Sequence, residues 1–327
     1  MITLKDIAQM ADVSPSAVSR YLNGGSLSEE KSQRIRDAIA QTGYRPNQAA
    51  QTLRTGTLKQ VGVIVPKINS NSVSNVVAGI NSVMAANGYS LLLGTTAGQD
   101  EKELHFLNLM QDNQVSGIIV MGTTMTPMKK DTFKSCRVPL VITGQNFGEI
   151  CCVHHDDYGA MQALAEAMIA RGRRKIVYVG VDEKDAATGL ARRKAAFDAL
   201  RQADLDAVYL LAQDYEVESG YQCAQQILAL YPDTDGILCA TDKLAHGVMK
   251  ALKEAGKHLP EDVSICGVGD DWPDQLTTPT LTTARLYHEQ CGEDAASILL
   301  QMIEGKTEGQ PLRQIKLGYT ILRRESL

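Results

Sequence analysis

The chain has 327 residues, of which 44% are hydrophobic, and its formal net charge at pH 7 is −5. This length allows a small module plus one or two full-sized domains, whereas no run approaches the roughly 18 to 20 apolar residues of a membrane span and no secretory signal opens the chain, so we expect a cytoplasmic protein. Seven scattered cysteines without a C-x-x-C pair argue against a disulfide framework and against a zinc site.

Three short helices are predicted in residues 1–46. The first opens at Thr3, and the third runs from Glu29 until Gly43 ends it. The second begins at Ser14, whose hydroxyl can cap free amides, with Pro15 in a favoured first position. A helix-turn-helix protein presents side chains to base edges from such an exposed helix start, although a protein docking module is the alternative. The candidate DNA contacts of this head are Thr3, Ser14, Pro15, Ser16, Ser19, Arg20, Asn23 and Tyr44.

The charge distribution favours a nucleic-acid partner at this end of the chain. Residues 1–60 hold eight lysines and arginines against five aspartates and glutamates, a charge of +3, so the remainder carries −8. A basic module on an acidic body attracts phosphates at one end only, and its DNA binding weakens as salt rises.

Residues 47–58 are predicted to form a hinge helix and linker between the head and a core of residues 59–327. The run from Asn47 to Arg54 spans about two helical turns with almost no apolar face, and a helix this short is marginal alone in water. We therefore expect a conditional helix. Its candidate DNA contacts are Asn47, Ala50, Leu53 and Arg54.

From residue 61 onward, short β-rich runs alternate with longer amphipathic helices. Strands are predicted at residues 61–65, 90–93, 117–121, 140–143, 175–179, 207–211, 236–240 and 264–268. Helices are predicted near residues 73–87, 101–113, 158–171, 190–203, 217–230, 243–255 and 288–304. This alternation predicts an α/β core of two doubly wound parallel-sheet subdomains, with a ligand in the cleft beyond the carboxyl ends of the strands.

Several runs resemble the lactose-repressor (LacI/GalR) family. They are TLKDIA from Thr3, VSPSAVSR from Val13, Asn23-Gly24, GYRPN from Gly43, DDYGA from Asp156, CATD from Cys239, PTLTT from Pro279 and LRRES from Leu322. The resemblance therefore covers essentially the whole chain. It implies a periplasmic-binding-protein-like core and a homodimer whose paired recognition helices lie in successive major grooves of a pseudo-palindromic operator.

The resemblance also implies that Leu53 wedges into the minor groove, where unstacking costs roughly a few kcal/mol and the contacts permitted by the bend offset it. An ordinary core leucine is the alternative. In the core, Arg193 and Asp242 match positions that hold sugar hydroxyls in the family, and their donor and acceptor groups suit a polyol. A structural salt bridge is the alternative for each. The sequence departs from the family at Gln145 and Ser70, which puts a standard monosaccharide site in doubt.

Lys67 follows the first core strand at a position expected to face the cleft, where a cation could neutralise a phosphate. The alternative is that it points into solvent. Residues 178–181, 185–189 and 238–242 are most similar to the trehalose-operon or sucrose-operon branch of the family, which favours a phosphorylated disaccharide as effector. The candidate effector-binding residues are Lys67, Asn69, Ser70, Gln145, Arg193, Asp242 and Asp270.

No metal, cofactor or catalytic set is expected. The run His154-His155-Asp156-Asp157 does not predict a metal site, because neighbours on an extended strand point to opposite faces, and a loop cap or hinge role is expected instead. The glycines of Gly267-Val268-Gly269 lack the spacing of a dinucleotide site.

The function indicated is therefore a bacterial, nucleoid-associated transcriptional repressor of a sugar-utilisation operon, released from its operator by a sugar effector. Two alternatives stay open. One is a regulator whose ligand strengthens DNA binding, as a corepressor does. The other is a sugar-processing α/β enzyme with an added DNA-binding head.

Overall fold

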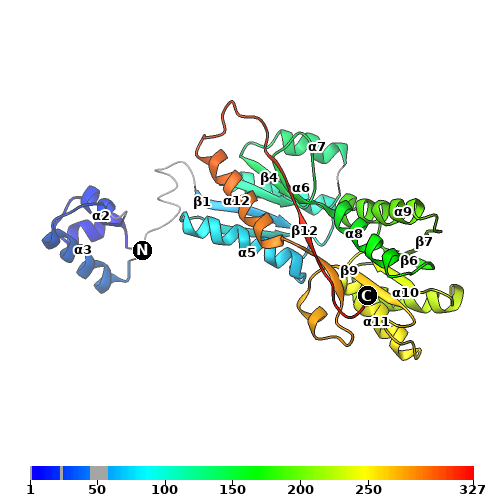
Figure 1. Cartoon of the computed structure of the whole chain (residues 1–327). Coiled ribbons are helices and arrows are strands. Elements are labelled where there is room, and N and C mark those ends of the chain that lie inside the picture. The colour runs from blue at the N-terminus through cyan, green and yellow to red at the C-terminus, as the bar shows by residue number, and fades with distance from the viewer. Residues whose placement is uncertain (1, 23–24, 45–57, 125) are drawn as a thin grey trace. The chain divides into compact units, whose positions relative to one another are not determined.

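The computed structural model describes residues 2–22, 25–44, 58–124 and 126–327 (Figure 1). The chain divides into two compact units, Met1–Leu58 and Lys59–Leu327. The segment predicted as a hinge helix, including Asn47, Ala50, Leu53 and Arg54, lies outside the described residues, as does Asn23. Among the described residues, no helix combines the length and apolarity needed to cross a bilayer.

The first unit contains the three predicted helices, α1 (Leu4–Met10), α2 (Pro15–Leu22) and α3 (Glu29–Thr42). Thr3 and Asp6 form a capping box at α1, in which the Thr3 amide donates to Asp6 Oδ2 at 2.7 Å. The amide of Ala17 donates to Ser14 Oγ at 3.2 Å, which caps α2 as predicted. Gly43 ends α3 with a left-handed φ of 63°. The buried core of this unit consists of Ile7, Ala8, Ala11, Val18, Ile35 and Ala38.

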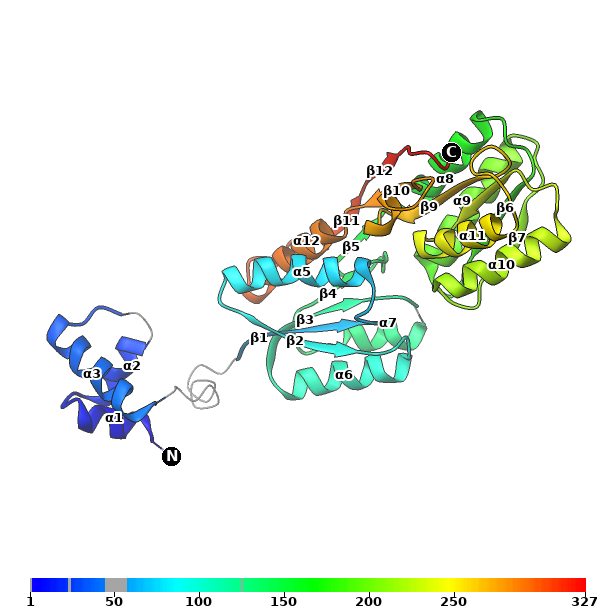
Figure 2. The same ribbon diagram turned by 90° about the horizontal axis from the view of Figure 1, so that it is seen from below.

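The second unit contains two six-stranded sheets, which confirms the predicted pair of α/β subdomains. The amino-terminal sheet has the order β11-β5-β4-β3-β1-β2. Its strands are β1 (Leu58–Val65), β2 (Ser90–Thr95), β3 (Val115–Met121), β4 (Leu140–Thr143), β5 (Cys152–His155) and β11 (Gln314–Leu317). Helices α5 (Asn71–Ala86) and α12 (His288–Ile303) cover one face, and α6 (Asp100–Asp112) and α7 (Pro127–Lys134) cover the other (Figure 2).

Two glycines allow α5 and α12 to pack closely. A Cβ at Gly79 would lie 2.0 Å from the carbonyl oxygen of Glu289, and one at Gly292 would lie 2.1 Å from that of Val76. Each glycine therefore brings the backbone of its helix against the backbone of the other helix.

The carboxy-terminal sheet has the order β12-β10-β9-β8-β6-β7, in which β12 runs antiparallel to β10. Its strands are β6 (Ile176–Gly180), β7 (Val208–Leu211), β8 (Gly236–Cys239), β9 (Ser264–Gly269), β10 (Thr282–Leu286) and β12 (Tyr319–Leu322). Its helices are α8 (Asp157–Ala170), a π-helical turn at Ala186–Ala191, α9 (Arg192–Gln202), α10 (Val217–Leu230), α11 (Asp242–Glu254) and a 3₁₀ turn at Trp272–Gln275.

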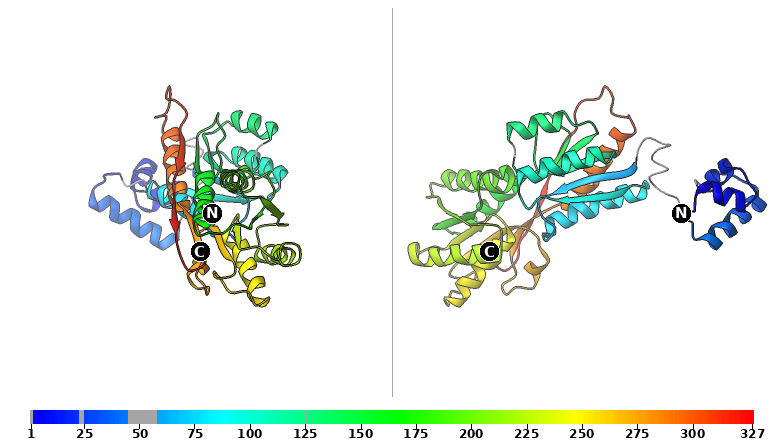
Figure 3. Two further views of the ribbon diagram at one scale, coloured as in Figure 1. Left: turned by 45° about the vertical axis from the view of Figure 1, so that its right-hand side comes forward. Right: turned by 180° about the vertical axis from the view of Figure 1, so that it is seen from behind.

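Within the described residues, the chain passes between the two sheets three times (Figure 3). The crossings join β5 to α8, β10 to α12, and β11 to β12. The sequence patterns did not predict β5, β10, β11, β12 or α7. Four of these five elements lie at or beside a crossing or complete an edge of a sheet, where the regular strand-helix alternation breaks down.

Candidate functional site

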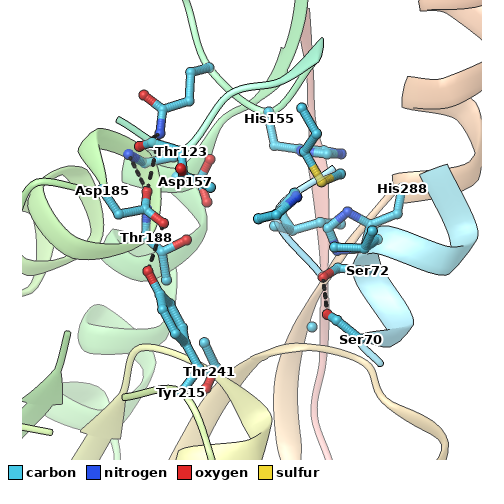
Figure 4. Close-up of a pocket in the computed structure, with 18 of the residues that line it drawn as sticks. Ser70, Ser72, Thr123, His155, Asp157, Asp185, Thr188, Tyr215, Thr241 and His288 are labelled. Carbon is cyan, nitrogen blue, oxygen red and sulfur yellow. Dashed lines mark hydrogen bonds between the residues drawn. The ribbon is translucent and has the colours of Figure 1, made fainter. Parts of the chain in front are cut away.

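A cavity of about 680 Å³ lies among the loops at the carboxyl ends of the parallel strands, with walls from both subdomains. Loops after β1, β3 and β4 form one side, and loops after β6, β8 and β9 form the other, which is the place that the fold class predicts for a ligand. Its polar and charged lining residues include Lys67, Ser70, Ser72, Thr123, Gln145, His155, Asp157, Asp185, Thr188, Arg192, Tyr215, Thr241, Asp242, Lys243, Asp271 and His288 (Figure 4).

Four of the seven predicted effector residues line this cavity, namely Lys67, Ser70, Gln145 and Asp242. The other three do not. Asn69 is exposed outside the cavity lining, although it lies between two residues that contribute to it.

The prediction for Arg193 is shifted by one residue. Arg193 forms an ion pair with Glu183, and its guanidinium lies 5.2 Å from the ring centroid of Tyr209, outside the cavity lining. Arg192 lines the cavity instead. The π-helical turn that precedes α9 sets the phase of this helix start, and one helical residue rotates a side chain by about 100°.

Arg192 holds the carboxylate of Asp157 in place at the cavity wall. Its Nε and Nη2 atoms donate to Asp157 Oδ1 at 2.8 and 2.6 Å, and its Nη1 donates to the carbonyl oxygen of Ala240 at 2.5 Å. Arg192 and Asp157 are both buried, so the pair is protected from solvent screening. Asp157 and Arg192 both line the cavity.

Asp270 also lies away from the cavity lining. Its backbone is left-handed, with φ 59°, and its carboxylate accepts from Arg285 Nε at 2.7 Å and pairs with Arg324. Asp270 therefore anchors β10 and the carboxy-terminal segment, and its neighbour Asp271 faces the cavity.

Two lysines share one carboxylate at the cavity wall. Lys67 Nζ lies 3.2 Å from Glu216 Oε1 and 5.2 Å from the centroid of the Tyr215 ring, while Lys243 Nζ lies 2.9 Å from Glu216 Oε2. Hydrogen bonds from Lys243 and Lys67 lower the pKa of Glu216 despite its partial burial. Both lysines also help to lower the pKa of Asp214, so two ammonium groups and two carboxylates meet at this wall, and an anionic ligand would compete with the carboxylates for the lysines.

The amino terminus of α5 contributes to the same end of the cavity. Ser70 occupies the N-cap position, yet its side chain makes no capping hydrogen bond and instead lies 2.9 Å from Ser72 Oγ. The first-turn amides of a helix carry partial positive charge and are a common site for anions.

Gln145 and Tyr215 converge on Asp185 from opposite subdomains. Gln145 Nε2 donates to the carbonyl oxygen of Thr123 and, at 3.3 Å, to Asp185 Oδ1, and the Tyr215 hydroxyl donates to Asp185 Oδ2 at 2.9 Å. Burial raises the pKa of Asp185, although the amide of Thr188 donates to it at 2.9 Å. This network and the contact of Lys67 with Glu216 both bridge the cleft.

Asp242 is almost fully buried at the start of α11. It accepts from Thr283 Oγ1 at 2.7 Å and from the amide of Asp271 at 3.3 Å, and burial raises its pKa to about 6. A Cβ at Gly267 would lie 2.2 Å from Asp242 Oδ1, and one at Gly269 would lie 2.6 Å from Oδ2. Gly267 and Gly269, whose spacing does not fit a dinucleotide site, therefore leave room for the carboxylate of Asp242.

The residues from His154 to Asp157 have different roles. His155 and Asp157 line the cavity, whereas the amide of Gly159 donates to Asp156 Oδ1 at 3.2 Å, which caps α8. His154 does not line the cavity. No group of three or more His, Cys, Asp or Glu side chains within the described ranges could hold a metal ion.

Sequence reasoning missed several lining residues, chiefly Asp157, Asp185, Arg192, Tyr215, His155 and His288. Asp185 and Tyr215 could have been found from their position, since they follow the strands predicted at residues 175–179 and 207–211. Asp157 and His288 carry no such signal, because they follow β5 and β10, which the sequence patterns did not predict.

In the amino-terminal unit, the start of α2 is open to solvent. Ser14, Pro15, Ser16 and Arg20 are exposed, and Ser19 is half-buried. Thr3 is exposed but takes part in the α1 capping box, and Tyr44 packs against the core of the unit.

Comparison with known proteins supplies the family. Residues 3–47 match the model of the bacterial regulatory proteins of the lacI family, and residues 165–327 match a periplasmic binding protein-like domain. The sucrose operon repressor of Staphylococcus xylosus is 32% identical over 304 residues, which cover 93% of this chain and 94% of that protein.

The chain belongs to the lacI family of bacterial regulatory proteins. The ribose operon repressor of Bacillus subtilis is another relative, 28% identical over 98% of this chain and 97% of that protein. A lac repressor dimer bound to operator and an anti-inducer shares the fold, with a TM-score of 0.91 at 22% identity over 99% of this chain and 98% of that one. As a member of the lacI family, the chain is a DNA-binding transcriptional repressor with a ligand-binding core, and not an enzyme.

Proposed function

We propose that this lacI-family repressor is released from its operator by a phosphorylated disaccharide of the trehalose or sucrose type. The observation that carries the proposal is the pair Lys67 and Lys243, which both contact Glu216 and line the cavity together with Ser70 at the amino terminus of α5. The sucrose operon repressor of Staphylococcus xylosus, as a relative by sequence, supports a sugar as the effector class.

The phosphate of such an effector would bind between Lys67 and Ser70. Lys67 is one-third exposed, so its ammonium group can exchange part of its contact with Glu216 for a phosphate oxygen. Ser70 and Ser72 offer hydroxyl groups that can donate to a phosphate oxygen. The first backbone amides of α5 carry partial positive charge, which also attracts an anion.

The sugar rings would bind deeper, among groups that recognise hydroxyls. The carboxylate groups of this region belong to Asp157, Asp185 and Asp242. Arg192 holds the carboxylate of Asp157 in place, and Gln145 holds that of Asp185. A cavity of about 680 Å³ lies within the roughly 300 to 1,000 Å³ typical of small-molecule sites.

We propose a homodimer on a pseudo-palindromic operator, with residues 1–46 as the reading head, 47–58 as the hinge and 59–327 as the core. The exposed start of α2, with Ser16 and Arg20, supports this role, because Arg can pair bidentately with guanine. The lac repressor that shares the fold was solved as a dimer on operator. Nucleoid association would follow from operator binding.

Effector and operator would favour different angles between the two subdomains. Two contacts support this mechanism, since Lys67 with Glu216 and Gln145 with Asp185 both bridge the cleft that an effector enters. Each ligand then weakens the other by the same factor, and a coupling of roughly 1 to 3 kcal/mol gives about 5- to 150-fold.

The experiment is operator binding by fluorescence anisotropy, with the operator selected from random duplex by the full-length protein. Trehalose, sucrose and their 6-phosphates are added separately. We expect release by a phosphorylated sugar at a concentration at which its unphosphorylated parent has no effect. Tighter operator binding would favour the corepressor alternative, and equal effects of phosphorylated and plain sugars would refute the phosphate.

A further inference from the structure

One glutamate beside the cavity contacts two lysines instead of capping its own helix. Glu216 occupies the N-cap position of α10, yet its side chain makes no capping hydrogen bond. Its two carboxylate oxygens instead lie 3.2 Å from Lys67 Nζ and 2.9 Å from Lys243 Nζ. The amide of Glu216 donates to Asp214 Oδ1 at 2.9 Å, so the backbone at this position is held independently of the side chain. The Glu216 side chain therefore serves the lysines and not the helix.

The three charged groups come from both sides of the cleft. Lys67 follows β1 of the amino-terminal subdomain, whereas Glu216 and Lys243 lie at the starts of α10 and α11 of the carboxy-terminal subdomain. Both lysines line the cavity, and Glu216 lies outside its lining. A ligand in the cavity therefore meets the two ammonium groups while they are in contact with a carboxylate of the protein.

The contacts of Glu216 with the lysines can be exchanged for contacts with a ligand. The side chains of Lys67, Lys243 and Glu216 are 33%, 30% and 44% exposed, and ion pairs this open to water are weak. Lys67 has a second contact, because its Nζ lies 5.2 Å from the centroid of the Tyr215 ring. The Glu216 carboxylate can therefore turn into solvent while the Lys67 ammonium group stays at the cavity wall.

The neighbouring carboxylate of Asp214 is held in place by its own helix. Its Oδ1 accepts from Ser219 Oγ at 2.5 Å as well as from the amide of Glu216, which ties it to the first turn of α10. Asp214 therefore contributes a fixed charge to this wall, whereas Glu216 is the carboxylate that can move.

We propose that Glu216 is a specificity-determining residue, which occupies the two lysines in the empty protein and yields them only to a group of higher charge than its own. The inference rests on the proposed function. Exchange of one carboxylate for another gains no charge at the lysines, whereas a phosphate group carries about −1.5 to −2 at pH 7 and offers three strong acceptor oxygens. A phosphorylated sugar therefore displaces Glu216, and a sugar carboxylate of the same size does not.

The test is isothermal titration of the full-length protein with trehalose and sucrose, with their 6-phosphates, and with the same disaccharides oxidised to a carboxylate at C6. We expect wild type to bind the phosphate most tightly and the carboxylate no more tightly than the plain sugar. Glu216→Gln should bind the phosphate at least about fivefold more tightly than wild type does, because no carboxylate of the protein has to be displaced. The same variant should also bind the sugar carboxylate at least about threefold more tightly than the plain sugar.

Glu218→Gln is the matched control, because it removes the same charge two residues further along α10, outside the cavity lining. An equal gain in Glu218→Gln would mean that the net charge of this region, and not the contact with the lysines, sets the affinity, and would overturn the inference. Unchanged or weaker phosphate binding by Glu216→Gln, or equal binding of sugar carboxylate and sugar phosphate by wild type, would also overturn it alone. Binding of neither sugar phosphate by wild type, or equal binding of phosphorylated and plain sugar, would overturn the proposed function and this inference with it.

Discussion

Replacement of Lys67 by alanine tests the phosphate site directly. The change removes an ammonium group 3.2 Å from Glu216 and 5.2 Å from the centroid of the Tyr215 ring. Two unit charges about 4 Å apart attract by about 4 kcal/mol at an effective dielectric constant near 20, before desolvation is subtracted. Lys243 remains beside Glu216, so part of the positive charge is retained.

The net loss for phosphate should therefore be close to that of one hydrogen bond to a charged group, about 1.5 to 3 kcal/mol. This corresponds to about 10- to 150-fold weaker binding of trehalose 6-phosphate or sucrose 6-phosphate. Binding of the plain disaccharide should change by less than about threefold, because it presents no charge to Lys67.

Isothermal titration of wild type and variant with both forms of the sugar gives the four affinities. Lys250→Ala is the matched control, since Lys250 also lies 5.2 Å from a tyrosine ring centroid and pairs with a glutamate, but it does not line the cavity. Equal losses for the phosphorylated and plain sugars, or no loss for either, would refute the assignment of the phosphate to Lys67.

Three further predictions concern the stability of the core, measured by urea unfolding of the full chain. Gly79→Ala should lower the free energy of unfolding by about 1 to 3 kcal/mol, because the new methyl meets the carbonyl oxygen of Glu289, whereas alanine at the unobstructed helix residue Ser74 should change it little. Arg192→Leu should cost about 3 to 5 kcal/mol by leaving a buried Asp157 unpaired, and Arg193→Leu, on a partly exposed pair, should cost less, about 1 to 2 kcal/mol including its contacts with Phe197 and Tyr209; similar costs would contradict this difference. Burial raises the folded pKa of Asp242, which shares a hydrogen bond with Asp274, so the favourable contribution of this pair is present below about pH 4 and is lost as pH rises; Asp242→Asn should therefore gain stability relative to wild type as pH rises above about 4, and a constant difference would count against the burial argument.

The sequence predicted those features that depend on residues close together in the chain. Ser14 and Gly43 act as the cap and the stop of their helices because capping is decided within one helical turn. The strands that face helices on both sides, such as β3, are continuous apolar runs, which made the parallel sheets predictable.

Other features depend on tertiary placement that no short pattern carries. The π-helical turn before α9 exchanges the roles of Arg192 and Arg193, although both are arginines at the same helix start. His155 and His288 meet only because two crossings between the sheets bring together residues far apart in the chain. β12 pairs antiparallel at the edge of a parallel sheet, so the alternation of strands and helices could not predict it.

The central claim is that effector and operator compete through one equilibrium of the core. Its most direct measurement is the affinity of the full-length protein for trehalose 6-phosphate or sucrose 6-phosphate, taken with and without saturating operator duplex. The account predicts that operator weakens sugar-phosphate binding by the same factor by which the sugar phosphate weakens operator binding, between about 5 and 150. Unchanged sugar-phosphate affinity on operator, while the same compound still releases the operator, would contradict it.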